Sequence, residues 1–458
     1  MLEPAYALYF WGFLLLYGGL MYAITPRAHT VTAFFRGTDD AGRPASGWAL
    51  TCSIFISWIF AKSVTNAANL GAAYGVVGGL AYAAYWLSIP FAGWVIYRLR
   101  RRHAATGLVA FLTERYGKAA AAAFAVAILI RLYNEVWSNT AVVGAYYGKP
   151  GTGTFIAAAL VFTAASLCYS VKGGLRSSIV TDVIQSVLFV GIMSVVLAFV
   201  LPQHGAPQLL SVGRFTLDAG VDLLLVALLQ VLSYPFHDPV LTDRGFITEE
   251  KTMLRAMVWS GVLGFVCIFM FSLVGVHAKL EGLPAGENMP GEVARAFGAL
   301  PYLLMTLVMI LAAGSTLDST FAAVAKSVGI ELPALLGRTA GKRAVTTGMW
   351  TMIAFAAFGN VPMIAGTDIL QATTISGTMV MGLAPVFLFA GLTRHSPWSF
   401  HLAFWPGVAL GIALTVGAIP PSWAIGAGKY GLLLGTNFYG LIICSAGFLV
   451  PIAWQRLR

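Results

Sequence analysis

Long apolar runs recur along the whole chain, and they restrict its fold more than any other feature. Charged residues make up only 10% of the 458 residues, too few to cover a soluble protein of this size. About thirteen runs reach the roughly 20 residues that a helix needs to cross a bilayer. The sequence therefore predicts an all-α polytopic membrane protein with about 13 transmembrane helices. Their expected starts lie near Ala5, Gly47, Tyr74, Ala119, Thr152, Ser177, Val221, Met253, Pro301, Val345, Ile364, His401 and Gly431.

The basic residues are unevenly distributed between alternate loops. The chain carries 28 Lys and Arg residues and a net charge of +10, and most of these residues fall in one set of loops, which includes residues 98–102, Lys172 and Arg244. Because cytoplasmic loops carry an excess of Lys and Arg, this pattern predicts an N-terminus outside the cell and a cytoplasmic C-terminus. The same pattern explains the positive charge without nucleic acid, which we exclude as a partner.

The segment 47–75 is predicted to be a membrane helix with an unusual number of polar side chains. Its most constraining residue is Lys62, because an unpaired lysine at the bilayer centre costs about 2.5 to 3.5 kcal/mol on insertion scales. Trp58, Lys62, Asn66 and Asn69 share one helical face. We therefore expect Lys62 to face a partner, a cavity or a ligand along a polar path. A polar seam between packed helices is the alternative.

Two later spans also carry charged residues. Arg131 and Glu135 are four residues apart on one face and can pair, while Trp137 and its neighbours offer groups that could line a solute pocket. Asp182 lies one turn into the span that begins near Ser177, without a basic residue following it on that helix. This position favours a bound cation, and a salt bridge to another helix, for example to Lys62, is the alternative.

The span that begins near Val221 is predicted to be broken. Pro235 and Pro239 interrupt it around Tyr234 and His237. Proline removes a backbone donor and ends the helix, which frees carbonyl groups at membrane depth. Such breaks are tolerated around cavities, so we expect this break to line a solute path.

The span that begins near Pro301 carries hydroxyl groups on one stripe. Ala312, Ser315, Thr316 and Ser319 recur at helical spacing, and Asp318 lies beside them. Hydroxyl and carbonyl oxygens suit a small hard cation. Helix packing through small residues is the alternative reading.

The order of the spans predicts an internal repeat. Without the first and the last two spans, ten remain, and they form two sets of five that each begin with an interrupted polar helix. Because five is odd, the two sets have opposite orientations, which is the inverted-repeat plan of transporters. We expect a peripheral helix and loop at 1–46, the two repeats at 47–201 and 202–393, and two peripheral helices at 394–458. The inner loops contain no phosphate loop, catalytic triad or zinc signature, so we expect no enzyme.

Several motifs resemble one transporter family. The stretch YSVKGGLRS at residues 169–177 is followed by Thr181-Asp182 and Gln185, and Gly47-Trp48 opens the polar helix. With Ala312-x-x-Ser315-Thr316, these residues resemble the sodium:solute symporter family, whose members include proline, pantothenate, sialic acid and sugar transporters. The resemblance implies the fold of the leucine transporter and location in an inner (plasma) membrane of bacterial type.

The resemblance also implies two ion sites. The sodium ion, the expected cofactor, would bind at a main site, and a second site would hold a further cation or a proton. The main site would use oxygens of Ile56, Ile59, Ala312, Ser315 and Thr316. The second would use Asp182, Ser315 and Ser319, with Asp318 as an added carboxylate. Proline transporters of the family carry an Asp at the position of Trp58, so proline is not the expected solute.

These features predict a sodium-coupled symporter for a small organic solute, with an amino acid or organic acid favoured by Lys62. The alternatives are a proton-coupled or sodium-independent transporter of the same fold and a membrane-embedded solute sensor with a separate signalling partner. The solute and the oligomeric state are left open. The candidate solute contacts are Ser57, Trp58, Lys62, Asn66, Glu135, Trp137, Tyr234 and His237.

Overall fold

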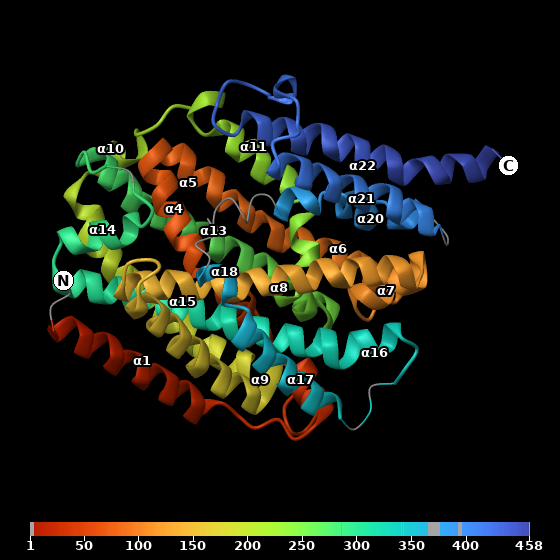
Figure 1. Cartoon of the computed structure of the whole chain (residues 1–458), viewed down its shortest axis with the longest axis horizontal. Helices are drawn as coiled ribbons and strands as arrows, with labels where there is room; N and C mark the ends of the chain where they lie inside the picture. Colours follow the sequence, from red (N-terminus) through yellow and green to blue (C-terminus); the bar gives the residue numbers. More distant parts are fainter. Residues whose placement is uncertain are drawn as a thin grey trace.

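The chain is a bundle of helices. The computed structural model describes residues 4–284, 286–339, 341, 343–364, 376–392 and 396–457, and every element in these ranges is a helix. Most helices run along the long axis, and the two chain ends lie at opposite ends of the bundle (Figure 1). Nine described helices are long and apolar enough to cross a membrane, or ten when one bent pair counts as a single span. The predicted all-α polytopic architecture is confirmed.

The helices fall into a first half, up to residue 203, and a second half. The first half contains α1 (Pro4–Ile24), α2 (Val31–Arg36), α3 (Gly47–Ser57), α4 (Ala61–Tyr74), α5 (Val76–Ala83), η1 (Ala84–Leu87), α6 (Ser88–His103), α7 (Leu108–Tyr116), α8 (Lys118–Tyr147), α9 (Gly153–Val200) and η2 (Leu201–Gln203). The second half contains α10 (Ala206–Leu210), η3 (Leu217–Ala219), α11 (Val221–Gln230), η4 (Tyr234–His237), α12 (Pro239–Thr242), η5 (Asp243–Phe246), α13 (Glu250–Leu280), α14 (Met289–Ala296), α15 (Ala299–Lys326), η6 (Ser327–Glu331), α16 (Leu332–Leu335), α17 (Ala344–Phe358), α18 (Val361–Ile364), α20 (Leu383–Leu388), η7 (Ala390–Leu392), α21 (Pro397–Thr415), η8 (Pro421–Trp423) and α22 (Gly431–Leu457).

The helices α3 and α4 form one interrupted span at the centre of the bundle. They are bent by 58° against each other. Ser46 begins α3 by accepting a hydrogen bond from the Ala49 N–H, and Phe60 is extended at the break, with φ −66° and ψ 142°. Every residue from 50 to 68 is buried. The polar side chains of this segment therefore face protein and not lipid.

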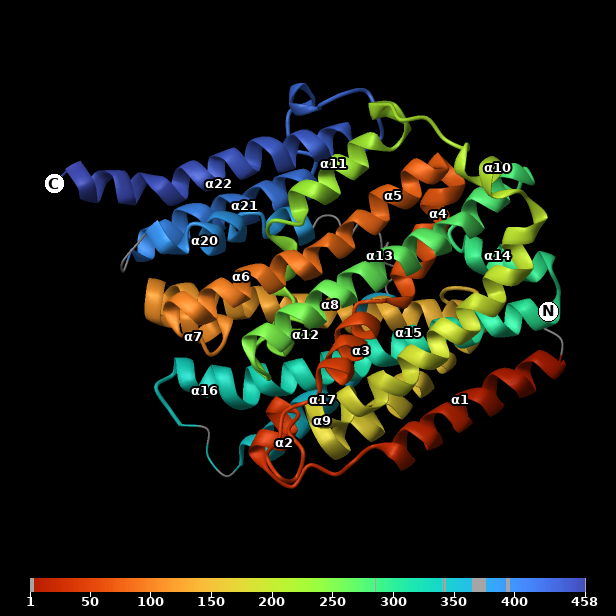
Figure 2. The same cartoon turned by 180° about the vertical axis from the view of Figure 1, so that it is seen from behind.

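The second interrupted span consists of α11, η4 and α12. The break contains Pro235 and Pro239, as predicted, and Asp238 begins α12 by accepting a hydrogen bond from the Val240 N–H. The two breaks meet in the middle of the molecule, where the rings of Trp58 and Tyr234 are 6.2 Å apart. In Figure 2, α3 and α12 lie next to each other near the centre of the bundle, and the two helices contact each other. The sequence thus brings two discontinuous helices together at one level of the bundle.

The helix α9 is two spans joined at a sharp turn. Its 48 residues would extend roughly 72 Å as a straight helix, more than twice the thickness of a bilayer core. Gly174 interrupts it with φ 56° and ψ −135°, a conformation that glycine adopts without steric cost. The two arms of α9 lie side by side next to α1 (Figure 2). The predicted glycine turn between two spans is therefore confirmed.

Two groups of helices enclose the breaks. The helix α13 packs mainly against α3, α4 and α6, whereas α15 packs mainly against α9 and α8. Ser315 and its neighbours on α15 are completely buried, as are Asp182 on α9 and Glu135 on α8. Polar residues from both groups therefore point into the interior at the level of the breaks.

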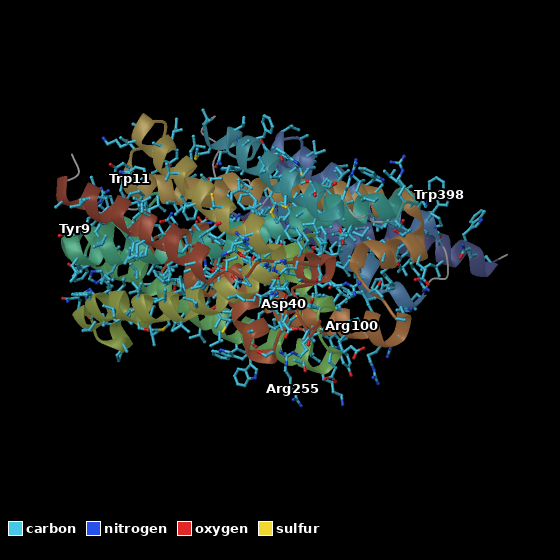
Figure 3. The ribbon with its side chains drawn as sticks, turned by 90° about the horizontal axis from the view of Figure 1, so that it is seen from below. Tyr9, Trp11, Asp40, Arg100, Arg255 and Trp398 are labelled. Carbon is cyan, nitrogen blue, oxygen red and sulfur yellow. The ribbon has the colours of Figure 1, made fainter. Side chains whose placement is uncertain are left out.

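The orientation of the chain in a membrane stays a prediction, together with the kind of membrane. In Figure 3, Tyr9 and Trp11 of α1 lie toward one end of the molecule, Asp40 and Arg255 near the middle of its length, and Arg100 farther from α1. The repeat boundaries also stay predictions. Residues 365–375 of the span expected near Ile364 and the boundary at 393 lie outside the described residues.

Candidate functional site

Four buried charges form a continuous chain of ion pairs at the two helix breaks, which we call the ion-pair cluster: Lys62, Glu135, Arg131 and Asp238. Lys62 Nζ donates to Glu135 Oε1 at 2.7 Å and to Ser138 Oγ at 3.0 Å. Arg131 pairs with Glu135 on its own helix, and Arg131 Nη2 donates to Asp238 Oδ2 at 3.0 Å. All four charged residues are at most 2% exposed.

The ion-pair cluster contains two positive and two negative groups. Its formal charge is therefore zero, which offsets much of the cost of removing four charges from water. The expected Arg131–Glu135 pair is present. Lys62 has the partner that its position required, and this partner is Glu135 and not Asp182. The cluster links the first broken helix to α8 and, through Asp238, to the second.

Aromatic rings surround the ion-pair cluster. Trp58 Nε1 donates to Asp238 Oδ2 at 3.1 Å. The ring centroid of Phe60 is 5.0 Å from Lys62 Nζ, and that of Tyr234 is 5.3 Å from the Arg131 guanidinium carbon. These distances allow cation–π attraction, which is strengthened where water is excluded. The site thus combines both signs of charge with flat apolar surfaces.

His237 lies beside this aromatic wall. Its Nδ1 is 2.6 Å from the carbonyl oxygen of Tyr234, and its ring centroid is 5.0 Å from the Tyr234 ring. His237 is 2% exposed, and its Nε2 has no hydrogen-bond partner among the described residues. Since buried polar atoms are normally paired, this nitrogen is available to a solute or a water molecule.

A second polar group, the hydroxyl cluster, surrounds Asp182. We define it as Asp182 with Ser53, Ser178, Ser315 and Ser319. Ser53 Oγ donates to Asp182 Oδ2 at 2.5 Å, and Ser315 Oγ donates to Asp182 Oδ1 at 2.5 Å. Ser178 Oγ is 2.8 Å from Ser319 Oγ. The cluster brings together α3, α9 and α15, and all of its side chains are buried.

Arg244 places its guanidinium inside the hydroxyl cluster. Its Nη2 donates to Asp182 Oδ2 at 3.1 Å and to Ser319 Oγ at 2.7 Å, and its Nε donates to Ser53 Oγ at 2.7 Å. Arg244 is 1% exposed. The sequence-based assignment of Arg244 to a cytoplasmic loop is therefore wrong. The loop assignment rested on the position of Arg244 after the proline break, where the apolar pattern ends. The signal that could have corrected it is Asp182, a buried carboxylate that requires a cation.

Asp318 lies next to the hydroxyl cluster with hydroxyl partners alone. Thr181 Oγ1 donates to Asp318 Oδ2 at 3.0 Å, and Ser319 Oγ donates to Asp318 Oδ1 at 3.3 Å. Asp318 is completely buried. No Lys, Arg or His of the described residues lies within 4.0 Å of its carboxylate oxygens. Asp318 is therefore the acidic group of this region that has no counter-ion in contact.

The residues expected at the main sodium site lie where α15 contacts the first break. Thr316 Oγ1 donates to the carbonyl oxygen of Ala312 at 3.1 Å and to that of Ser57 at 3.3 Å. Ile56 and Ile59 are completely buried at the break, and the Ile59 N–H donates to the Ile56 carbonyl oxygen at 3.0 Å. The expected oxygen ligands thus come from two helices in direct contact.

The structure separates the candidate solute contacts into groups. Trp58, Lys62, Glu135, Tyr234 and His237 meet at the ion-pair cluster. The others lie apart, as follows: Ser57 Oγ is 2.8 Å from Ser319 Oγ in the hydroxyl cluster, Asn66 Nδ2 donates to Tyr82 Oη at 3.2 Å, and Trp137 packs with Phe155, Ala159 and Met363. Trp137 is therefore the candidate that packs in a separate apolar cluster, away from the polar groups.

Comparisons identify the fold. No protein-family model and no curated protein matches the chain. A solved Na⁺-coupled sialic acid symporter in a substrate-bound, outward-open state matches with a TM-score of 0.76, at 14% identity, over 98% of this chain and 97% of the other. This chain has the fold of that symporter. The predicted leucine-transporter type of fold is confirmed, while membership of the sodium:solute symporter family stays a prediction.

Mhp1, a nucleobase-cation-symport-1 family transporter, also shares the fold. Its closed conformation with bromovinylhydantoin bound matches with a TM-score of 0.57, at 12% identity, over 94% of this chain and 95% of Mhp1. Its inward-facing conformation matches with a TM-score of 0.51, at 12% identity, over 91% and 94%. Both solved proteins are transporters and not enzymes. At these identities the likeness concerns the fold alone.

Proposed function

We propose that this protein is a secondary active transporter that moves a small organic solute by alternating access, coupled to sodium. The observation that carries the proposal is the meeting of two interrupted helices around fully buried charges. In this fold the substrate and ion sites lie between such helices, near the middle of the membrane. The ion-pair cluster would contact the solute, and the contact between α15 and the first break would bind sodium.

The ion-pair cluster favours a solute that carries a carboxylate, and an amino acid in particular. Lys62 and Arg131 offer positive charge, while Glu135 and Asp238 offer negative charge at the same level. A zwitterion would exchange partners with the cluster without adding net charge to the interior, which limits the electrostatic cost of binding. Trp58 and Tyr234 would supply apolar contact, and His237 Nε2 a free polar atom.

Arg244 bears on the number of ions transported. Its guanidinium occupies the space between Asp182 and Ser319, where a second cation was expected. A sodium ion at this position would have to displace the Arg244 guanidinium, which is already paired with the Asp182 carboxylate and with hydroxyl groups. We therefore propose that one sodium ion, at the main site, is coupled to the solute.

Arg244 also supports a particular state for this structure. Its hydrogen bonds to Ser53, Ser178 and Ser319 tie η5 to α3, α9 and α15. We propose that the path toward the cytoplasm is closed by these contacts.

Thermal unfolding of the purified protein in sodium or potassium tests the sodium site. A ligand that binds only the folded state raises the midpoint of unfolding. Sodium is expected to stabilise the wild type more than potassium does, and Ser315→Ala is expected to lose this difference. Ser194→Ala, an exposed serine on α9, serves as the matched control and is expected to retain it. Equal midpoints in the two salts for the wild type would contradict the proposal.

Proton coupling is the second candidate, because Asp318 is a buried carboxylate without a contacting cation. In that case uptake would ignore sodium, would collapse with a protonophore, and would be lost in Asp318→Asn. Sodium-dependent uptake that persists with the protonophore would exclude this candidate.

A further inference from the structure

A group of potential metal ligands lies far from the sites described above. His277 and Glu281 are four residues apart at the end of α13, and His204 follows η2. One donor atom from each of the three lies within 4.8 Å of the others. Among the described residues, this is the one group of three or more His, Cys, Asp or Glu residues with donors so close together. Figure 1 places the adjoining α10 and α14 at the end of the bundle opposite the C-terminus.

The two histidines have unmet hydrogen-bonding capacity. His277 is 5% exposed, and its Nδ1 has no hydrogen-bond partner among the described residues. His204 Nε2 is 3.1 Å from Glu281 Oε1. The ring centroids of the histidines are 5.1 Å apart with their planes at 51°, so the rings are tilted toward each other and not stacked. A buried imidazole nitrogen without a partner requires an explanation, such as a missing ligand.

The donor set fits a zinc ion. Two imidazoles and one carboxylate, with a fourth position open to water, are a common zinc coordination set. Bond lengths of about 2.0–2.1 Å in a tetrahedron place the donor atoms about 3.3 Å apart. The distance between His204 and Glu281 already matches this value, and small side-chain movements bring the His277 nitrogen to it. We propose that His204, His277 and Glu281 bind Zn²⁺.

The site connects two helix groups. His204 belongs to the segment that leaves α9, which packs mainly on α15, while His277 and Glu281 belong to α13, which packs mainly on α3, α4 and α6. A bound ion would hold the ends of α9 and α13 together. If the proposed transport function is correct, so that these groups move against each other in each cycle, Zn²⁺ slows transport by linking them.

A purely structural role is the competing explanation. Glu281 alone can pair with His204, and basic groups at the C-terminal end of a helix are favourable without a metal. The two explanations differ in what they predict for metal binding, because the structural role requires no ion.

The test is calorimetric titration of Zn²⁺ into full-length protein that is free of a histidine tag and has been treated with a chelator. The wild type is expected to bind one Zn²⁺ per chain, reversibly with chelator. His204→Ala and Glu281→Gln are each expected to weaken binding by about tenfold or more, since loss of an outer-shell partner alone costs 10–100-fold. Both side chains are partly exposed, so these variants should fold. His29→Ala, at an exposed histidine, should bind like the wild type.

Two results would overturn the proposal: no chelator-reversible Zn²⁺ binding by the wild type, or unchanged binding in both variants. This experiment does not depend on transport. If Zn²⁺ binds but no solute is transported, the metal site stands and the proposed function fails. If transport is found and Zn²⁺ does not bind, the reverse holds.

Discussion

At the scale of single residues, buried charges dominate this protein. Lys62 in an apolar chain had to have a partner, and the structure supplies Glu135, together with Arg131 and Asp238. Such clusters are stable only when their charges balance, because removing one member leaves another uncompensated in a medium where water is scarce. The residue pattern therefore predicted that a partner existed, but the choice of partner depended on which helices pack together.

The balance of the ion-pair cluster can be measured. Lys62→Met and Glu135→Gln are each expected to lower the free energy of unfolding by about 3–5 kcal/mol, since each leaves one unbalanced buried charge. The double variant retains the Arg131–Asp238 pair and is expected to lose less than the sum of the two. Thermal unfolding in detergent provides the measurement. Arg43→Ala, which breaks the exposed pair with Asp39, serves as the control and should change little. Strictly additive losses would show that Lys62 and Glu135 are not coupled.

Arg244 is expected to act as a tethered cation. Arg244→Ala leaves Asp182 among hydroxyl groups without a counter-ion, a site that suits sodium. Sodium should therefore stabilise this variant, relative to potassium, by more than it stabilises the wild type. Arg255→Ala, at an exposed position on α13, should behave like the wild type. A sodium effect of the same size in Arg244→Ala and wild type would contradict this role.

At the scale of elements, the sequence predicts structure correctly where a single residue determines the backbone conformation. Pro235 and Pro239 broke the helix at the expected place, and Gly174 gave the turn between the two arms of α9. The sequence does not predict which side chains from distant segments contact one another. Arg244 was assigned to a loop because it follows the break, and Trp137 was grouped with the solute contacts, although it packs against Phe155.

The turn at Gly174 offers a direct test of the backbone argument. An added Cβ would collide with the carbonyl oxygen of Phe34, and the positive φ is itself unfavourable for alanine. Gly174→Ala is therefore expected to lower stability by about 1–3 kcal/mol or to prevent folding. Gly191→Ala, on the same helix with open space around it, should be neutral or slightly stabilising. Comparable stability of the two variants, measured by thermal unfolding, would refute the requirement for glycine.

At the scale of the whole molecule, the long apolar runs predicted an all-α polytopic membrane protein, and the resemblance to a transporter family implied the leucine-transporter type of fold. The fold does not identify the solute or the ion, because these depend on a few side chains at the breaks. The proposed coupling is energetically sufficient. One charge crossing 100 mV yields about 2.3 kcal/mol and a tenfold sodium gradient about 1.4 kcal/mol more, so roughly 500-fold accumulation is attainable.

The most direct test of the central claim is uptake of labelled amino acids and organic acids by proteoliposomes that contain the purified protein. With an inward sodium gradient and a negative interior, we expect accumulation above equilibrium for a carboxylate-bearing solute. This accumulation should vanish when choline replaces sodium and in Ser315→Ala, but not in Ser194→Ala. Uptake that merely equilibrates the solute, or that is equal in sodium and choline, would contradict sodium-coupled transport.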